Sequence, residues 1–440
     1  MGDLYNKDNE MTKKIGFTSI FLLGINGIIG SGIFLLPGKM YQDMAVSSLL
    51  VILFASFMVL MIALCYAELA SRYSEDGAAW LYVYKAFGKF SGFEVGLSIW
   101  FLSVTILAAE TSAFLTTLQG VIPALKDTMV YNLVGVGVLL LLFVANLFGT
   151  LIMKLLNNIS STSKLAIIIL FIVVGLFFIK FDNFSVFLPA GAHTFTSISK
   201  DFAKALSVIF YAFIGFSFLP VAAAKMNNPK RNIPLALISV ILASTVLYGL
   251  ITFVCIGILG TSLSGEILPA AMAFKQIWGS LGYNLIIIGM LVSIGGLAVS
   301  FSFNAPVIAS SMSEKKLLPS CFSKKNKFES PYISSLVTFG LAMILVVSGD
   351  FMYLISLSVF ISFLHNVPSI LAMMKLRKKD ENIGFKVPGG YTIPILALAS
   401  SAYLITGFTL QIVITGVILV LIGVLLYWIQ KRMTKKETTL

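Results

Sequence analysis

A glycine–serine–glycine stretch interrupts the first apolar segment of the chain, within the residues IIGSGIF at 28–34. Glycine and serine are poor helix formers, so we expect the helix to break here. A broken helix leaves carbonyl groups without partners at the end of one half and N–H groups without partners at the start of the next. The N–H end binds a carboxylate and the carbonyl end accepts from an ammonium group. The break therefore predicts a site for a ligand that carries both groups.

A second apolar segment has a similar interruption in the residues YAFIGFSFLP at 211–220. The predicted carboxylate donors are the N–H groups of Gly30, Ser31 and Gly32. The predicted amine acceptors are the carbonyl groups of Ile28, Tyr211 and Ile214. Close packing between helices is the alternative explanation of such small residues. The occurrence of two interruptions at corresponding places favours the binding site.

Two ionisable residues lie inside apolar segments, where an ionised group costs at least about 2.5–3.5 kcal/mol on insertion scales and marks a functional position. Lys164 lies near the start of one such segment, and its alternative role is to extend towards the membrane surface. Glu110 lies well inside another segment. It is a candidate proton acceptor, a candidate counter-ion for a cationic substrate, or a structural carboxylate bound to serine and threonine hydroxyls.

The composition of the chain indicates that these two charges lie in membrane-spanning elements. Of 440 residues, 58% are hydrophobic and 11% are charged, and the mean hydropathy is +0.97. A soluble core cannot hide this much apolar surface, and alternating strands of a β-barrel are absent from the sequence. The net charge of +12 does not indicate nucleic-acid binding, because the basic residues are distributed between segments and form no single patch. We expect no metal site, no cofactor, no ATP-binding loop and no enzymatic activity.

Twelve apolar segments predict an all-α polytopic membrane protein. They lie near residues 15–36, 44–70, 91–122, 129–150, 160–180, 200–224, 234–260, 281–312, 332–349, 351–374, 391–408 and 410–430. One set of alternate loops, with the two termini, holds 24 of the 31 Lys and Arg residues, whereas the opposite loops hold six. Positive charge stays on the cytoplasmic side, so we expect both termini in the cytoplasm.

The two interruptions also predict the internal organisation of a single transmembrane domain over residues 1–440. Five segments separate the first interruption from the second, so residues 15–180 and residues 200–374 form five-helix repeats of opposite topology. Two additional helices follow at 391–430. Inverted repeats with broken helices at corresponding positions indicate the binding site of a secondary transporter.

Several ordered motifs resemble the amino acid–polyamine–organocation transporters. The first is IIGSGIFLLPG at 28–38, and the segment 65–96, which begins CYAELASR, is similar to the second helix and the start of the third. NLFG at 146–149 with Lys164, NNPKRNIPLA at 227–236 and KKLLP at 315–319 follow at the family's spacings. The resemblance covers nearly the whole chain and implies the LeuT-type fold of five plus five helices, with helices 1 and 6 broken.

The resemblance also implies roles for particular residues. The substrate backbone is expected on the segment from Ile28 to Gly32 and on the segment formed by Tyr211, Ala212, Phe213, Ile214 and Gly215. Tyr211 matches the position of an aromatic gate, and Phe301 matches an aromatic wall of the pocket. Lys164 matches a lysine that approaches helices 1 and 8 where sodium-coupled relatives hold Na⁺, so Lys164 and Glu110 are the candidate coupling residues.

Together these observations predict a secondary active transporter of the cytoplasmic membrane for neutral amino acids. Ser217, at a position where many relatives carry glutamate, disfavours a guanidinium substrate. Coupling is expected by proton symport or by amino acid exchange. An exchanger of an amino acid for an amine or a polyamine is the alternative, with Glu110 holding the amine. A membrane sensor that binds amino acids without transporting them belongs to a different class, and the sequence shows no large soluble domain for it to signal through.

Overall fold

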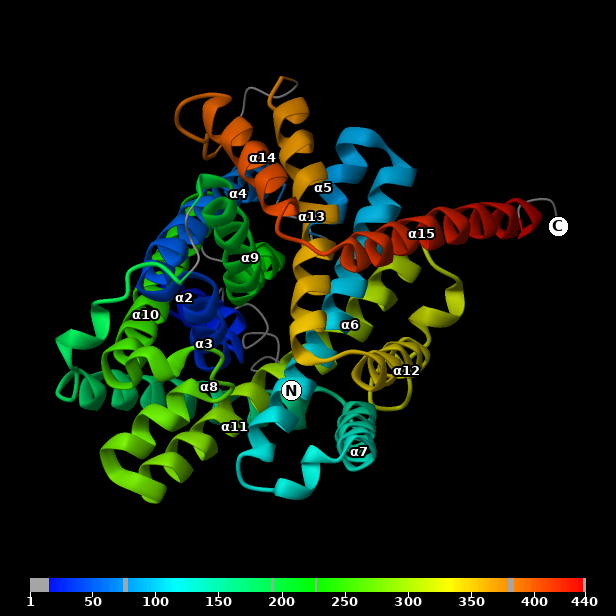
Figure 1. The fold of residues 1–440 in the computed structure, drawn as a ribbon. Helices are drawn as coiled ribbons and strands as arrows, with labels where there is room; N and C mark the ends of the chain where they lie inside the picture. The colour runs from blue at the N-terminus through cyan, green and yellow to red at the C-terminus, as the bar shows by residue number, and fades with distance from the viewer. Residues whose placement is uncertain (1–15, 74–77, 191–193, 226–227, 379–383, 438–440) are drawn as a thin grey trace, which may run out of the picture.

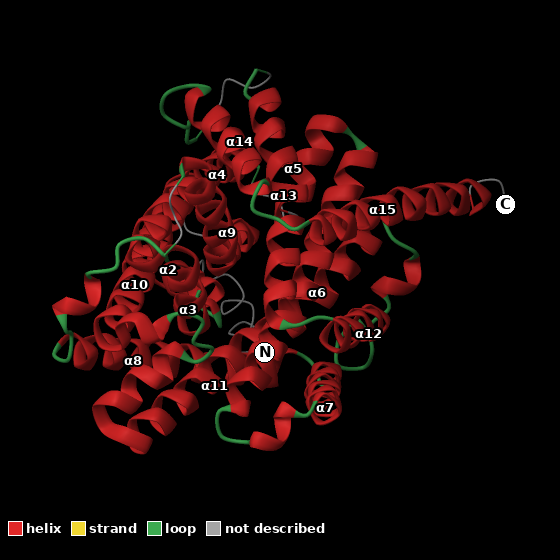
Figure 2. Cartoon of the chain, in the orientation of Figure 1, coloured by secondary structure: helices red, strands yellow, loops and turns green. Residues whose placement is uncertain are grey.

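Helices and the loops between them make up the described part of the chain (Figure 2). The structure, a computed structural model, describes residues 16–73, 78–190, 194–225, 228–378 and 384–437. The N-terminal residues 1–15 and the C-terminal residues 438–440, which the sequence assigns to the cytoplasm, lie outside these ranges. Within the described residues no strand is present.

Fourteen α-helices are found in these residues. They are α2 (Phe17–Ile28), α3 (Gly32–Met44), α4 (Ser48–Arg72), α5 (Ala78–Phe87), α6 (Lys89–Gln119), α7 (Thr128–Leu147), α8 (Thr150–Leu176), α9 (Phe195–Phe213), α10 (Pro229–Leu259), α11 (Pro269–Glu314), α12 (Tyr332–Ser348), α13 (Phe351–Leu376), α14 (Thr392–Ile405) and α15 (Leu410–Glu437). The 3-10 helices are η1 (Ala45–Ser47), η2 (Pro123–Lys126), η3 (Phe181–Phe184), η4 (Ile214–Lys225), η5 (Gly260–Leu263) and η6 (Ser320–Ser323).

Many of these helices are apolar enough to cross a membrane. Eight stretches of the described residues meet both the length and the hydropathy that a span requires, and four further apolar helices are shorter. Every one of the twelve apolar segments of the sequence is helical over most of its length. The chain is therefore a multi-pass membrane protein. Helix α5 lies in a loop of the predicted topology, and its 10 residues are too short to span a bilayer.

Both predicted interruptions are present in the backbone. Helix α2 ends at Ile28 and α3 begins at Gly32, with Ile29 in an extended conformation between them (φ −79°, ψ 107°). In the second segment α9 ends at Phe213 and continues as the tighter helix η4. A third irregularity, at Gly279 (φ 64°), kinks α11 in a region that the sequence did not mark.

Side-chain caps fix where several helices begin. The Asp127 carboxylate accepts from the N–H groups of Met129 and Val130 at the start of α7, at 2.9 and 3.0 Å. Asp350 accepts from the N–H of Tyr353 at the start of α13, at 2.7 Å. These contacts satisfy N–H groups that the helix itself leaves without partners.

The broken elements lie against one another within the bundle (Figure 1). Helix α3 packs on α9, and α2 packs on η4 and α10. Helix α6 packs on α11 and α13, and α11 also packs on α8. Helix α15, drawn in red, extends away from the bundle towards the C-terminus. This packing brings α2, α3, α6, α8, α9 and α11 together around the two interruptions.

Candidate functional site

Glu110 of α6 contacts the break between α2 and α3. Its carboxylate accepts from the Ser31 N–H at 3.1 Å through Oε2 and from the Ser31 hydroxyl at 2.8 Å through Oε1. Both side chains are fully buried. The sequence predicted that Ser31 donates to a carboxylate, and in this structure Glu110 supplies one.

Tyr211 of α9 donates to the same carboxylate, from its hydroxyl to Glu110 Oε1 at 2.8 Å. Glu110 therefore receives three hydrogen bonds from two residues, and all three donors are neutral. In the described residues it makes no ion pair. We call the Ser31 N–H, the Ser31 hydroxyl and the Tyr211 hydroxyl the carboxylate site.

Lys164 of α8 contacts the other side of the same break. Its ammonium donates to the Asn26 carbonyl at 3.2 Å, to the Asn26 side chain at 2.9 Å and to the Ile29 carbonyl at 2.5 Å. Only 1% of Lys164 is exposed. The lysine thus supplies a cation to the carbonyl end of α2, and Glu110 supplies an anion to the N–H end of α3. Both have the sign that the terminus favours.

A cavity lies where the two interruptions meet. It is lined by Gly27, Ile28, Gly30, Gly32, Ile106, Glu110, Tyr211, Ala212, Ile214, Gly215, Leu297 and Phe301. Nine of these lie among the residues that the sequence predicted for binding or coupling. Among the described residues that line the cavity, Glu110 alone carries a formal charge. The remaining lining surface is backbone or apolar side chain, apart from the Tyr211 hydroxyl.

The predicted amine acceptors each have a partner within the protein. The Tyr248 hydroxyl, from α10, donates to the Ile28 carbonyl at 3.2 Å and to the Ala212 carbonyl at 2.7 Å. The Tyr211 carbonyl accepts from the Ile214 N–H, and the Ile214 carbonyl accepts from Ser217 at 3.2 Å. A carbonyl oxygen has two lone pairs, so each can accept a second hydrogen bond. Tyr248 was not predicted from the sequence, because it lies in an ordinary apolar segment.

Phe213 and Phe301 have different surroundings. Phe301 lines the cavity and packs edge-on against Phe218, with ring centroids 5.4 Å apart. Phe213 is fully buried and packs edge-on against Tyr248, with centroids 5.0 Å apart. Phe213 therefore supports the tyrosine behind the break, and its side chain is not part of the cavity lining.

Glycine is required where the broken segments approach each other. A Cβ on Gly215 would lie 2.1 Å from the Gly27 carbonyl oxygen, which real structures do not allow. A Cβ on Gly30 would lie 2.8 Å from Glu110 Oε1 and 2.2 Å from a methyl group of Leu297. These two glycines permit the backbone contact and the approach of Glu110 that form the site.

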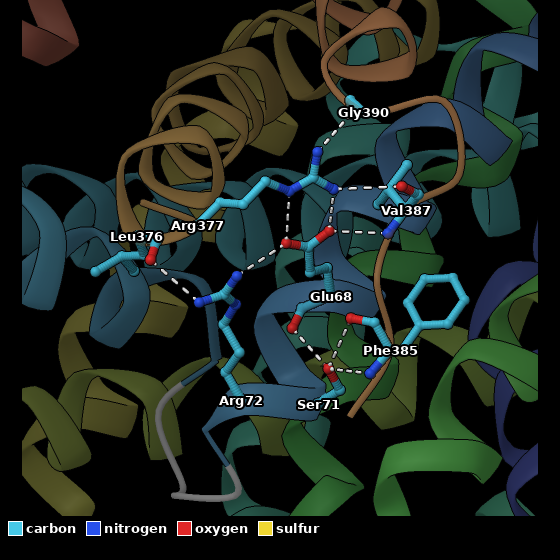
Figure 3. A network of polar contacts seen from close by, with 8 residues as sticks. All are labelled: Glu68, Ser71, Arg72, Leu376, Arg377, Phe385, Val387 and Gly390. Atoms are coloured by element: carbon cyan, nitrogen blue, oxygen red, sulfur yellow. Dashed lines mark hydrogen bonds and ion pairs between the residues drawn. The ribbon is translucent and has the colours of Figure 1, made fainter. Parts of the chain in front are cut away.

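A second buried carboxylate, whose partners do not line this cavity, lies near the end of α4 (Figure 3). Glu68 accepts from Arg72 at 3.1 Å and from Arg377 Nε at 3.0 Å, and a further bond joins it to Arg377 Nη2. The Val387 N–H adds a fourth bond at 2.9 Å. The three charged side chains are at most 6% exposed. We call Glu68, Arg72 and Arg377 the arginine cluster.

The arginine cluster connects distant parts of the chain. Arg72 also donates to the Leu376 carbonyl at 3.1 Å, and Ser71 accepts from the Phe385 N–H at 3.1 Å. Hydrogen bonds with Glu68 hold the pKa of Arg377 above its usual value. The cluster thus fixes the end of α13 and the following segment to α4. The sequence placed Glu68 and Arg377 near the ends of apolar segments and did not predict that they meet.

Metal ligands form no comparable group. Among the described residues no three His, Cys, Asp or Glu side chains are close enough to hold a metal ion. The three cysteines are free.

Comparison with known proteins gives concordant results. A family model described as amino acid permease matches residues 15–433. The chain is 25% identical to a methylthioribose transporter of Bacillus subtilis, over 97% of this chain and 95% of that protein. It is 28% identical to the serine/threonine exchanger SteT of the same organism, over 92% of this chain and 93% of that protein. It is 25% identical to the branched-chain amino acid permease BcaP of that organism, over 98% of this chain and 95% of that protein.

The expectation of an amino acid–polyamine–organocation transporter is confirmed by this family match over nearly the whole chain. The relatives are named as transporters, which are not enzymes. With its apolar helices and the cavity at their interruptions, the chain belongs to the amino acid permease family of membrane transporters.

Proposed function

We propose that the protein is a secondary active transporter of neutral amino acids in the cytoplasmic membrane. The observation that carries this proposal is the cavity between the two interrupted helices, beside which three donors bond the carboxylate of Glu110 and the Ile28 carbonyl is positioned to accept from an amine. The α-amino acid head group has both functions a bond apart. Ile106, Leu297 and Phe301 supply an apolar surface for its side chain.

The proposal includes a transport cycle. Twelve transmembrane helices form a five-plus-five inverted repeat, over 15–180 and 200–374, with two additional helices and both termini in the cytoplasm. The bound amino acid bridges α2 and α3 to α9 and η4, and these elements rock against the others to expose the cavity to one side at a time. Substrate contacts come from Ile28, Gly30, Ser31, Gly32, Tyr211, Ile214, Gly215 and Phe301, whereas Phe213 makes no contact of its own and acts by supporting Tyr248.

Lys164 and Glu110 are proposed to couple transport to protons or to exchange. The Lys164 ammonium already bonds the oxygen atoms at the end of α2, where a cation is favoured. Sodium is then not required, because the lysine takes its place. Glu110 can accept a proton or face the ammonium group of the substrate inside the cavity.

An exchanger of an amino acid for an amine or a polyamine is the second candidate. It is favoured by one observation, that the formal charge in the cavity lining is the negative charge of Glu110. An amine without a carboxylate would be held by that charge alone.

Counterflow in proteoliposomes tests the proposal. Vesicles are preloaded with a mixture of neutral amino acids and amines, and uptake of each labelled compound is measured in sodium-free buffer, with and without a proton gradient. We expect saturable amino acid uptake that falls at least about tenfold in Lys164→Ala, because the carbonyl groups of Asn26 and Ile29 lose their charged donor.

The matched control is Lys180→Ala, an exposed lysine just beyond the end of the same helix α8, which should retain uptake. Uptake of amines in preference to amino acids would favour the second candidate. Absence of counterflow for every compound, in protein that elutes as a single folded species, would contradict both transport functions and favour a sensor.

A further inference from the structure

Glu110 occupies the position that a substrate carboxylate needs. The Ser31 N–H and the Ser31 hydroxyl are the donors at the start of α3, and both donate to Glu110, as does the Tyr211 hydroxyl. The proposed function requires at least one of these donors for the carboxylate of the amino acid. All three are engaged within the protein.

We propose that Glu110 is a built-in occupant of the carboxylate site and that the substrate carboxylate binds by displacing it. This inference rests on the proposed function, because it describes how an amino acid enters that cavity. The two carboxylates exclude each other, since one N–H cannot hold both and two negative charges in one buried site repel.

The neutral character of the donors makes the displacement feasible. No lysine or arginine of the described residues pairs with Glu110, so no ion pair has to break when it leaves. The incoming carboxylate restores the same three hydrogen bonds with the same charge. Charge-assisted bonds of this kind are individually strong, so a site left without any carboxylate is disfavoured.

The displaced side chain keeps a function in the bound state. Glu110 lines the cavity beside Gly30, and the absence of a side chain there leaves the carboxylate in direct contact with the cavity. Once released from Ser31 and Tyr211, its charge faces the space where the ammonium group of the amino acid lies. Glu110 thus fills the carboxylate site when no substrate is bound, and it balances the charge of the substrate ammonium group when substrate is bound.

The carboxylate site can be tested without transport, using propionate, which has a carboxylate and no amine. Purified protein is unfolded thermally in detergent over a range of potassium propionate concentrations, against potassium chloride at matched ionic strength. In Glu110→Ala the site is open, so propionate should raise the unfolding temperature by about 2 °C or more and the rise should saturate. The wild type should show no such rise at tenfold higher concentration.

Glu110→Gln serves as the second variant, because it keeps the shape of the side chain if Glu110→Ala does not fold. Its amide holds the donors more weakly than a carboxylate and does not repel propionate. Half-saturation should therefore require more propionate than in Glu110→Ala and less than in the wild type. Thr117→Val, a buried change on the same helix whose hydroxyl bonds only its own turn at 2.8 Å, should behave as the wild type.

Equal propionate dependence in the wild type and in both Glu110 variants would overturn the inference. The outcome is independent of the counterflow experiment. If wild-type counterflow fails while propionate distinguishes the proteins in the expected order, the displacement stands and the proposed transport function falls. If counterflow succeeds and propionate does not distinguish them, the displacement falls alone.

Discussion

Two buried carboxylates of this protein have opposite surroundings. Glu68 is held by two guanidinium groups and a backbone N–H, whereas Glu110 is held by hydroxyl groups and a backbone N–H and makes no ion pair within the described residues. Both side chains are fully buried. The difference therefore lies in the charge of the partners and not in exposure to solvent.

This difference makes the contacts of Glu68 fixed and those of Glu110 exchangeable. Removing either member of a buried ion pair leaves a charge without compensation, so the arginine cluster resists change. Hydrogen bonds from neutral groups can pass from one carboxylate to another without leaving a charge behind. We infer that the arginine cluster holds α4 and α13 together throughout the transport cycle, while Glu110 changes partners within it.

The largest effect is expected at the arginine cluster. Glu68→Gln leaves the buried charges of Arg72 and Arg377 without their carboxylate, and breaking a buried pair costs about 3–5 kcal/mol. We expect a large loss of folded, monodisperse protein in size-exclusion chromatography and a lower unfolding temperature. Glu110→Gln should lose less, because the groups that donate to Glu110 are neutral and no ion pair is broken.

Glu314→Gln is the matched control for this comparison. Glu314 lies 3.8 Å from Lys325, and both side chains are about half exposed. Exposed pairs contribute about 0–1 kcal/mol, so this variant should unfold near the wild-type temperature. If Glu68→Gln is as stable as Glu314→Gln, the arginine cluster does not hold the helices together.

The fold and the helix breaks were largely predictable from local sequence. Apolar segments of sufficient length predict spanning helices, and the glycines beside Ser31 predict the end of α2 at Ile28. Gly279, where α11 kinks, lies in the loop that the sequence predicted between the segments 234–260 and 281–312, so the part of α11 that precedes the kink was missed. Helix α5 was missed because its segment is short and flanked by charged residues.

The candidate site was predictable only where a residue is unusual in its segment. Glu110 and Lys164 stand out as charges in apolar surroundings, and their contacts with the break agree with that signal. Tyr248, Ile106 and Leu297 are ordinary residues of apolar helices, so their place at the site depends on helix rotation and packing. The pairing of Glu68 with Arg377 joins residues 309 positions apart and has no local signal.

A smaller effect on stability is expected at Tyr248. Its substitution tests the neutral hydroxyl group that bonds the carbonyl groups at the helix breaks. Tyr248→Phe removes the hydroxyl that donates to the carbonyl groups of Ile28 and Ala212. A buried group left without its partner costs about 1–3 kcal/mol. The unfolding temperature should fall, by less than in Glu68→Gln, and the affinity for amino acid in the cavity should change as the two carbonyl groups become available.

Tyr283→Phe is the control, because its hydroxyl donates to the Gly120 carbonyl at 3.3 Å in a partly buried position away from the breaks. It should change stability by less than Tyr248→Phe does and leave affinity unaltered. Equal effects of the two substitutions would show that Tyr248 has no special part in holding the interrupted helices.

The smallest effect is expected on substrate preference. Its test compares two phenylalanines near the cavity. Phe301 lines the cavity and Phe213 packs behind it against Tyr248. Leucine conserves much of the volume of phenylalanine, so each Phe→Leu variant should cost less than about 1.5 kcal/mol in stability. A change of apolar contact in a binding pocket is nevertheless worth about 1–3 kcal/mol in discrimination between side chains. Phe301→Leu should therefore alter the ratio of uptake between large and small neutral amino acids, measured by counterflow, whereas Phe213→Leu should leave that ratio unchanged. An equal shift in both variants would mean that selection depends on the packing behind the break and not on the surface that the substrate contacts.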